Sequence, residues 1–214
     1  RYLEKENLKR CLTDMAEHGV KSVMYAGEGE PLLYKHLPEV ILHTKNAGID
    51  VSITTNAVAL TEKFARETLH SISWIKASVN GGTAETYAKI HQTKAIDFER
   101  ALGNLERAVQ IKLENKYNTA IGIQSLLLPE NAHEMEGLAE RAKSMGLNYL
   151  VLKPYSQHLM SKTHQYEQVD YDEFKFLEDK LEKLNGDGFN VVFRSRTMEK
   201  LKEATRHYTV CQAT

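Results

Sequence analysis

Cysteine is scarce in this sequence, because only Cys11 and Cys211 occur among its 214 residues. Two cysteines so far apart exclude a disulfide framework and a zinc site built from paired Cys-x-x-Cys motifs. Cys11 falls within a helical pattern of apolar residues, and we predict that it is a small core residue.

Long apolar runs and an excess of charge of one sign are also missing. No apolar stretch approaches the 18 residues of a membrane-spanning helix, and the first residues, "RYLEKE", contain no signal-peptide apolar region. The formal net charge is −1, so the basic footprint typical of a nucleic-acid binder is absent at the level of the whole chain. We therefore expect a cytoplasmic protein with neither a nucleic-acid nor a membrane partner.

What the sequence does contain is a regular alternation of strand-like and helix-like segments. Strands are predicted at about 21–26, 50–55, 74–80, 118–128, 148–154 and 188–196, and helices at about 6–18, 35–46, 97–113, 133–145 and 171–184, with further helices beginning at Thr61 and near Met198. This order favours parallel βαβ units with right-handed crossovers, and therefore an α/β protein.

Polar residues gather at the carboxyl ends of the predicted strands. They are Thr54, Asn56, Ser78, Asn80, Gln124, Lys153, Arg194 and Arg196, of which the two arginines are predicted to share a face of the last strand. Such residues at one end of successive parallel strands mark the active face of a (β/α) barrel. Because only about six strands are visible, we predict a partial (β/α)6 TIM-like barrel: a parallel sheet with outer helices.

The stretch "AGEGEPLL" directly follows the first predicted strand. Gly27 and Gly29 allow the backbone to approach a ligand closely, and Pro31 biases Glu30 toward an extended conformation. Carboxylates such as Glu28 and Glu30 are charge-assisted partners for an ammonium group. The alternative interpretation of the stretch is an acidic surface turn.

Three motifs in this order, "AGEGEPLL", "ITTNA" and "IKASVNGGTAETYAKIH", resemble the radical S-adenosylmethionine (SAM) superfamily, over roughly Leu3 to Pro154. Glu30 matches the family's glutamate before proline, whereas Glu28 stands where the family more often has glycine. The resemblance implies SAM-binding positions at Gly27, Glu28, Gly29, Glu30, Pro31, Thr54, Asn56, Ser78, Asn80, Gln124 and the backbone around Leu152.

Basic and aromatic residues near the predicted barrel mouth have several interpretations. Lys153 is a candidate for contact with the SAM carboxylate or a substrate, or for a catalytic role, whereas Lys76 is expected to pair with a neighbouring glutamate. Arg194 and Arg196 are candidates for gripping an anionic substrate group, with an ordinary salt bridge as the alternative. Tyr155 opens a polar stretch that is expected to contribute to substrate binding.

The resemblance also implies a [4Fe–4S] cluster, held by three cysteines, that reductively cleaves SAM to a 5′-deoxyadenosyl radical. That radical would abstract hydrogen from a peptide or small-molecule substrate, with flavodoxin or ferredoxin as electron donor. The sequence contains no such cysteine loop, so the first strand and the cluster loop are expected upstream of Arg1, and this chain alone is expected to be inactive.

The resemblance implies a division of the chain as well. Residues 1–160 are expected to form the partial-barrel core, and residues 161–214 a helix-strand-helix that completes the barrel. Cys211 is a candidate ligand of an auxiliary cluster in a further C-terminal extension of the SPASM or twitch kind.

Two other functions remain open at this point. The chain could be a cluster-free barrel that binds SAM or another ligand without catalysis. It could also be a barrel enzyme that uses Glu28 or Glu30 as a general acid or base, assisted by Lys153.

Overall fold

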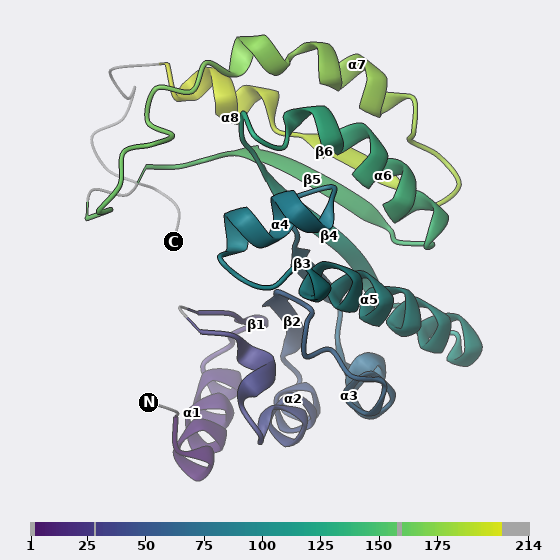
Figure 1. Ribbon diagram of the computed structural model, residues 1–214. Coiled ribbons are helices and arrows are strands. Elements are labelled where there is room, and N and C mark those ends of the chain that lie inside the picture. Colours follow the sequence, from purple (N-terminus) through teal and green to yellow (C-terminus); the bar gives the residue numbers. More distant parts are fainter. Residues whose placement is uncertain (1–2, 28, 158–159, 203–214) are drawn as a thin grey trace.

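Six parallel strands form one sheet, in the order in which they occur along the chain. The structure is a computed structural model that describes residues 3–27, 29–157 and 160–202 (Figure 1). The strands are β1 (Ser22–Tyr25), β2 (Asp50–Thr55), β3 (Trp74–Ser78), β4 (Ala120–Leu127), β5 (Tyr149–Pro154) and β6 (Asn190–Phe193). A parallel sheet in sequential order is the architecture that the predicted βαβ units require.

Helices connect the strands and frame the sheet. They are α1 (Lys5–Glu17), α2 (Leu37–Asn46), α3 (Glu62–Thr68), α4 (Ala84–His91), α5 (Ile96–Asn115), α6 (Met135–Ser144), α7 (Phe176–Glu182) and α8 (Ser195–Lys200). Short 3-10 turns lie at Pro31–Leu33, Leu69–Ser71, Ala132–Glu134 and Tyr171–Phe174. Within the described residues, no helix has the length and apolar character that crossing a membrane requires.

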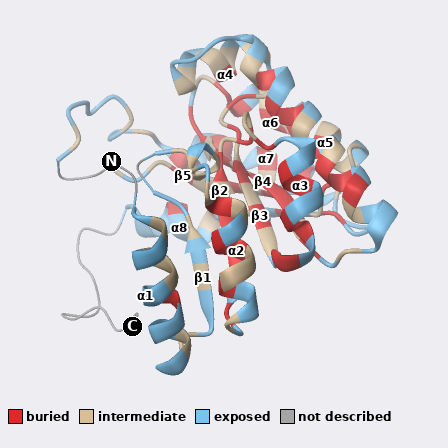
Figure 2. Ribbon diagram, turned by 90° about the horizontal axis from the view of Figure 1, so that it is seen from below, coloured by how far each residue is buried: buried red, intermediate tan, exposed pale blue. Residues whose placement is uncertain are grey.

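The two faces of the sheet differ in burial. On β2 and β3, Val51, Ile53, Ile75 and Ala77 are fully buried, and they belong to one apolar cluster with residues of α2, α3, α5 and α6. Figure 2 shows this buried layer between the sheet and the helices. The alternate residues form the face that we call the open face: Ser22, Met24, Asp50, Ser52, Thr54, Trp74, Lys76, Ser78, Ala120, Gly122, Gln124, Leu126, Tyr149, Val151, Lys153, Asn190 and Val192. It is less covered, since Met24 is 52% exposed and Val192 is 40% exposed.

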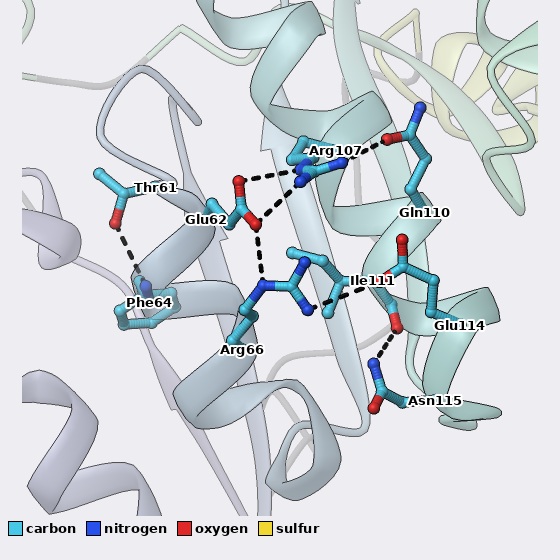
Figure 3. A network of polar contacts seen from close by, with 9 residues as sticks. All are labelled: Thr61, Glu62, Phe64, Arg66, Arg107, Gln110, Ile111, Glu114 and Asn115. Carbon is cyan, nitrogen blue, oxygen red and sulfur yellow. Dashed lines mark hydrogen bonds and ion pairs between the residues drawn. The ribbon is translucent and has the colours of Figure 1, made fainter.

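An ion-pair network on the outer surface joins α3 to α5 (Figure 3). The Arg107 guanidinium donates to both carboxylate oxygens of Glu62, at 2.8 and 3.0 Å, and Arg66 donates to Glu62 at 2.8 Å. Arg107 first and Arg66 second lower the pKa of Glu62 to about 2. Because α3 precedes β3 along the chain and α5 follows it, the network holds together two helices of the layer that covers the helix side of the sheet.

The structure corrects four sequence-based expectations. Helix α4 was not predicted; it begins at the Thr83 N-cap, whose hydroxyl accepts a hydrogen bond from the Thr86 N–H. The last strand ends at Phe193 and α8 begins at Ser195, three residues before the predicted helix start. Arg194 and Arg196 therefore do not share a strand face, because Arg196 lies in α8.

The other two corrections concern Cys11 and Lys76. Cys11 is exposed, and the residue that α1 buries is its neighbour Leu12. Lys76 forms no ion pair with a glutamate among the described residues and instead lies 5.4 Å from the centre of the Trp74 ring.

Candidate functional site

The loops that follow the strands meet at one edge of the sheet, since all six strands run in the same direction. Gly27 and Gly29 follow β1, Asn56 follows β2, and Asn80 follows β3. The open face leads up to this edge. The candidate site is therefore the edge together with the adjoining half of the open face.

The Glu30 carboxylate ties the loop after β1 to the end of β2. Its Oε1 accepts hydrogen bonds from the Thr55 hydroxyl at 2.6 Å and from the Leu32 N–H at 3.0 Å, and its Oε2 accepts one from the Asn56 N–H at 2.8 Å. Three donors from two loops hold one anion, and hydrogen bonds to an ionised group are the stronger kind. The carboxylate thus fixes the loop after β1 at the sheet edge.

The glycines of this loop leave space in front of the backbone. A Cβ built at Gly27 or at Gly29 would meet no atom within 4 Å. Neither peptide group forms a hydrogen bond to another residue in the described ranges. Pro31 begins a 3-10 turn with Glu30 as its N-cap, while Glu28 lies outside the described residues. The backbone of this loop is therefore accessible for close approach by a ligand.

Two predicted residues of the β2 end have different surroundings. Thr54 lies on the open face, and its hydroxyl is 3.5 Å from the Met24 sulfur. Asn56 turns its side chain back on its own loop, where its Oδ1 accepts a hydrogen bond from the Val58 N–H at 3.0 Å. Thr54 thus presents its hydroxyl on the open face with only a long contact to sulfur, whereas the Asn56 side-chain oxygen shapes the turn.

Ser78 and Gln124 are direct neighbours across β3 and β4 on the open face. Both are half-buried. Asn80 lies just beyond the strand, and its Oδ1 accepts a hydrogen bond from the Leu126 N–H at 2.9 Å. The structure brings Ser78, Gln124 and Asn80 together, and the side-chain oxygen of Asn80 joins β3 to β4.

Two residues that sequence analysis missed brace Asn80. Asn131 is fully buried, and its Nδ2 donates a hydrogen bond to the backbone carbonyl of Asn80 at 3.0 Å. His91 Nε2 accepts the Asn80 N–H at 3.1 Å, and its ring stacks on Tyr87 at 4.2 Å. His91 must therefore be neutral at Nε2, and burial lowers its pKa from the ordinary value of 6.5.

The His91 contact predicts a loss of stability in acid. Above pH 6.5 the ring is neutral in the folded and unfolded states, so its full contribution is present. As the pH falls below 6.5, the unfolded chain binds a proton and the folded chain does not, so the free energy of unfolding decreases until the pH passes the lower folded-state pKa. Urea unfolding at pH 7.5 and 5.0 measures this slope.

The matched control for His91 is the exposed His18. His91→Gln should flatten the pH dependence of the unfolding free energy, and His18→Gln should leave it as in the unaltered chain. An equal slope in all three proteins would show that His91 is not held neutral.

Glu134 secures the loop that carries Gly82. Its Oε2 accepts from the Gly82 N–H at 2.7 Å and the Thr83 N–H at 3.2 Å, and its Oε1 accepts from the hydroxyls of Thr83 at 2.9 Å and Thr86 at 2.6 Å. Burial opposes ionisation, but the Thr86, Gly82 and Thr83 hydrogen bonds together lower the pKa of Glu134. The "NGGT" stretch is thus held by a carboxylate 52 residues away.

The predicted residues of β5 lie on opposite faces. The Leu152 side chain is fully buried on the helix side, so only the backbone of Leu152 could contact a ligand at the sheet edge. Lys153 lies on the open face opposite Leu126 of β4. No carboxylate among residues 3–27, 29–157 and 160–202 forms an ion pair with it.

Tyr155 starts the long connection to α7. Its N–H donates to the Tyr171 hydroxyl at 2.7 Å, and its ring lies 5.4 Å from that of Tyr166. The Tyr166 hydroxyl donates to Glu130 at 2.9 Å, so the connection is tied to the loop after β4. Burial first, and then Glu130, raise the pKa of Tyr166 to about 12. Tyr155 therefore stands at the site edge within an ordered contact network.

A metal site is not apparent in the part of the chain that the structure describes. No group of three His, Cys, Asp or Glu side chains there could hold a metal ion. The candidate auxiliary ligand Cys211 falls outside the described residues.

Comparison with known sequences gives consistent results. The family model "Radical SAM superfamily" matches residues 1–142. A probable GTP 3′,8-cyclase of Methanococcus maripaludis is 24% identical over 163 residues, which cover 73% of this chain and 52% of the relative. An S-adenosylmethionine-dependent nucleotide dehydratase of Lacinutrix mariniflava is 33% identical over 89 residues, 42% of this chain and 18% of the relative. The chain spans about half the length, or less, of these relatives.

A solved structure has the same fold. Streptococcus suis SuiB bound to S-adenosylmethionine superposes with a TM-score of 0.70 at 14% identity, over 90% of this chain and 44% of SuiB. The predicted six-stranded partial barrel is thereby confirmed as the fold. With the family match over residues 1–142, the sequence and the sheet agree that the chain belongs to the radical SAM superfamily.

Proposed function

We propose that this chain is the SAM-binding core of a radical SAM enzyme. The observation that carries the proposal is the Glu30 anchor, in which three hydrogen bonds fix the loop after β1 at the edge where β3 also ends. Membership in the superfamily implies SAM and a [4Fe–4S] cluster as cofactors of the intact enzyme.

The loop after β1 fits the amino-acid part of SAM. Unfilled space at Gly27 and Gly29 supports close approach of an ammonium group to their carbonyl oxygens, which are strong acceptors. Because the Glu30 carboxylate is already engaged with Thr55 and Asn56, we assign Glu30 a positioning role: it holds the loop and contributes negative potential beside it.

Hydroxyl and amide groups of the open face fit the remainder of SAM. We assign Ser78 and Thr54 to the ribose hydroxyls or the carboxylate, since both present hydroxyls on that face. Gln124 and the Asn80 amide nitrogen are further donors next to Ser78. The backbone at Leu152 would border the adenine, as the resemblance implies.

The described residues do not supply ligands for a cluster, because no three suitable side chains come together. Membership in the superfamily implies cysteine ligands for the iron of the intact enzyme, and we assign no step to residues of this chain on the cluster's behalf. When bound, such a cluster supplies the electron that cleaves SAM. A flavodoxin or ferredoxin would reduce it, in the cytoplasm.

The proposed organisation follows the same logic. Residues 1–160 would form the core, and residues 161–214 would complete the barrel and lead toward an auxiliary-cluster extension that begins at Cys211. In the described part of that segment, β6 adds to the same sheet next to β5.

The substrate would be a peptide or a small molecule. SuiB has been solved bound to the precursor peptide SuiA, whereas the sequence relatives are named for GTP and nucleotide chemistry. Arg194 and Tyr155 at the sheet edge would contact the substrate, and Lys153 would contact the substrate or the SAM carboxylate.

The acid/base alternative has less support than the SAM site. Both oxygens of Glu30 already accept hydrogen bonds, and a general base needs a lone pair directed at its substrate. A cluster-free SAM-binding module remains the second candidate, since the open loop glycines fit ligand binding without catalysis.

Product formation tests the proposal. The full-length protein, reconstituted anaerobically with iron and sulfide and reduced with dithionite, should convert SAM into 5′-deoxyadenosine and methionine, which chromatography detects. Ser78→Ala should raise the SAM concentration needed for half-maximal rate, because one SAM hydrogen bond is lost.

The exposed Ser144→Ala is the matched control and should behave as the unaltered protein. A cluster-loaded, reduced protein that binds SAM but releases no 5′-deoxyadenosine would leave only the binding-module function.

A further inference from the structure

Three cations reach the open face near the site edge from three different elements. Lys76 lies on β3 and Lys153 on β5, and Arg194 directly follows β6. The Arg194 N–H donates to the Leu152 carbonyl at 2.9 Å, which places Arg194 beside Lys153 in the sheet. Their charges act on one another, since the pKa of Lys76 is lowered first by burial and then by Lys153 and Arg194.

No described carboxylate compensates this charge at the end of the open face where the cations lie. Asp50 is the one acidic strand residue on the described part of this face, and it lies at the opposite end of β2, where it pairs with Lys45. None of the three cations forms an ion pair with a described carboxylate. By contrast, Arg107 and Arg141 on the outer surface lie 2.8 and 2.6 Å from Glu62 and Glu99. Lys76 and Lys153 are partly buried, whereas Arg194 is exposed. Partly buried cations that are repelled by other cations are costly unless an anion joins them.

SAM does not supply enough negative charge. It has one carboxylate, and its ammonium and sulfonium groups make its net charge positive. One carboxylate can satisfy one of the three cations, so at least two remain for another ligand. A phosphate ester, with close to two negative charges at neutral pH and several acceptor oxygens, matches two lysines and an arginine.

The open face also has a built floor next to Lys76. Gly122 is the register neighbour of Lys76, and a Cβ at Gly122 would lie 2.4 Å from the Tyr149 ring. The Tyr149 hydroxyl donates to the Ile75 carbonyl at 2.9 Å, so the ring lies flat across β4. Burial raises the pKa of Tyr149 to about 12, which keeps it a neutral donor. Tyr149 thus forms a fixed floor on the open face beside Lys76, and Lys76 also contacts the Trp74 ring.

We propose that Lys76, Lys153 and Arg194 bind the phosphate group of a phosphorylated small-molecule substrate, above the Tyr149 floor. The inference deepens the proposed function and rests on it, because it assigns the substrate class of the same site. Lys76 and Lys153 act as point charges, and Arg194 donates through its planar guanidinium at the mouth.

Pyrophosphate binding tests the inference. Titration calorimetry of the full-length protein should show saturable binding that weakens as salt is raised. Lys76→Met and Arg194→Gln should each weaken it at least tenfold. The matched controls, Lys89→Met on α4 and Arg196→Gln on α8, remove exposed cations away from the open face and should leave the affinity unchanged. Thermal unfolding of each variant confirms that it is folded.

Two outcomes would overturn the inference: pyrophosphate binding that is unchanged in Lys76→Met and Arg194→Gln, or no saturable binding at millimolar concentration. Succinate binding as tightly as pyrophosphate would overturn the choice of phosphate. A parallel SAM titration separates the two proposals. SAM binding without pyrophosphate binding refutes this inference alone, and Arg194-dependent pyrophosphate binding without SAM binding refutes the proposed function alone.

Discussion

Replacing Thr55 by valine should weaken SAM binding, although Thr55 is buried and lies on the helix side of β2. Its hydroxyl is the 2.6 Å donor to Glu30, and its loss leaves the carboxylate held by two N–H groups. The loop after β1 would then sample positions in which the carbonyls of Gly27 and Gly29 no longer converge on the ammonium group. A hydrogen bond to a charged group contributes roughly 1.5 to 3 kcal/mol. Because Thr55 acts on SAM only through the position of the loop, we expect part of this energy to be lost from binding and SAM affinity to fall by a factor of about 3 to 10.

Glu30→Gln should have the larger effect. The glutamine side chain keeps one acceptor oxygen and turns an NH₂ group toward a donor that now lacks a partner, either Asn56 N–H or the Thr55 and Leu32 pair. We expect the free energy of unfolding to fall by roughly 1 to 3 kcal/mol and SAM affinity to fall at least tenfold. Calorimetric SAM titration and urea unfolding measure the two quantities.

Thr68→Val is the matched control, because Thr68 is also a buried threonine but bonds within α3. It should leave SAM affinity unchanged. If Thr55→Val and Glu30→Gln both bind SAM as tightly as the unaltered protein, the loop after β1 is not the ammonium site.

Gly82→Ala should destabilise the whole site edge. A Cβ at Gly82 would lie 2.6 Å from the Glu134 carbonyl oxygen and 2.7 Å from the Glu134 Cβ, so backbone must move. That movement breaks the hydrogen bonds from Gly82 and Thr83 to the Glu134 carboxylate. Overpacking and lost hydrogen bonds together should lower the free energy of unfolding by roughly 2 to 4 kcal/mol, measured by urea unfolding.

Gly103→Ala provides a control of opposite sign. Gly103 lies inside α5, and a Cβ there meets no atom within 4 Å. Alanine is a better helix former than glycine, so this change should stabilise the chain by about 0.5 to 1 kcal/mol. Equal stability of the Gly82→Ala and unaltered chains would contradict the close packing at Glu134.

Features with a local periodic signal could be predicted from the sequence. The six strand positions follow from short apolar segments such as "DVSITT" and "NYLVLKP". Several helix ends follow from glycines that take positive φ, such as Gly48 at 85° after α2. Parallel order and the single polar edge then followed from chain connectivity. The resemblance to radical SAM proteins extended these local signals to a family.

Features that depend on distant partners could not be predicted. The sequence predicts Glu30 as a partner of an ammonium group, but it gives no sign that the Glu30 carboxylate meets Thr55, 25 residues away, on the helix side of β2. Asn131 lies 51 residues from Asn80 and outside the three motifs. His91 ends the third motif, but nothing in the sequence indicates that it contacts Asn80, 11 residues earlier. Only the folded arrangement reveals that such residues brace the site.

The end of β6 shows a different limit. "VVFRSR" reads as a continuing strand, because valine, phenylalanine and alternating arginines all fit one. The backbone of Arg194 leaves the strand at φ −82° and ψ 48°, and α8 starts one residue later. A strand end without glycine or proline gives no local signal, which is why Arg196 was assigned to the wrong element.

A crystal structure of the full-length protein soaked with SAM would show where the ligand lies. We expect the methionyl ammonium within hydrogen-bond distance of the carbonyl oxygens at Gly27 or Gly29, and the Ser78 hydroxyl in contact with the same molecule. SAM bound on the helix side of the sheet, or with its ammonium away from the loop after β1, would rule out the proposed SAM site.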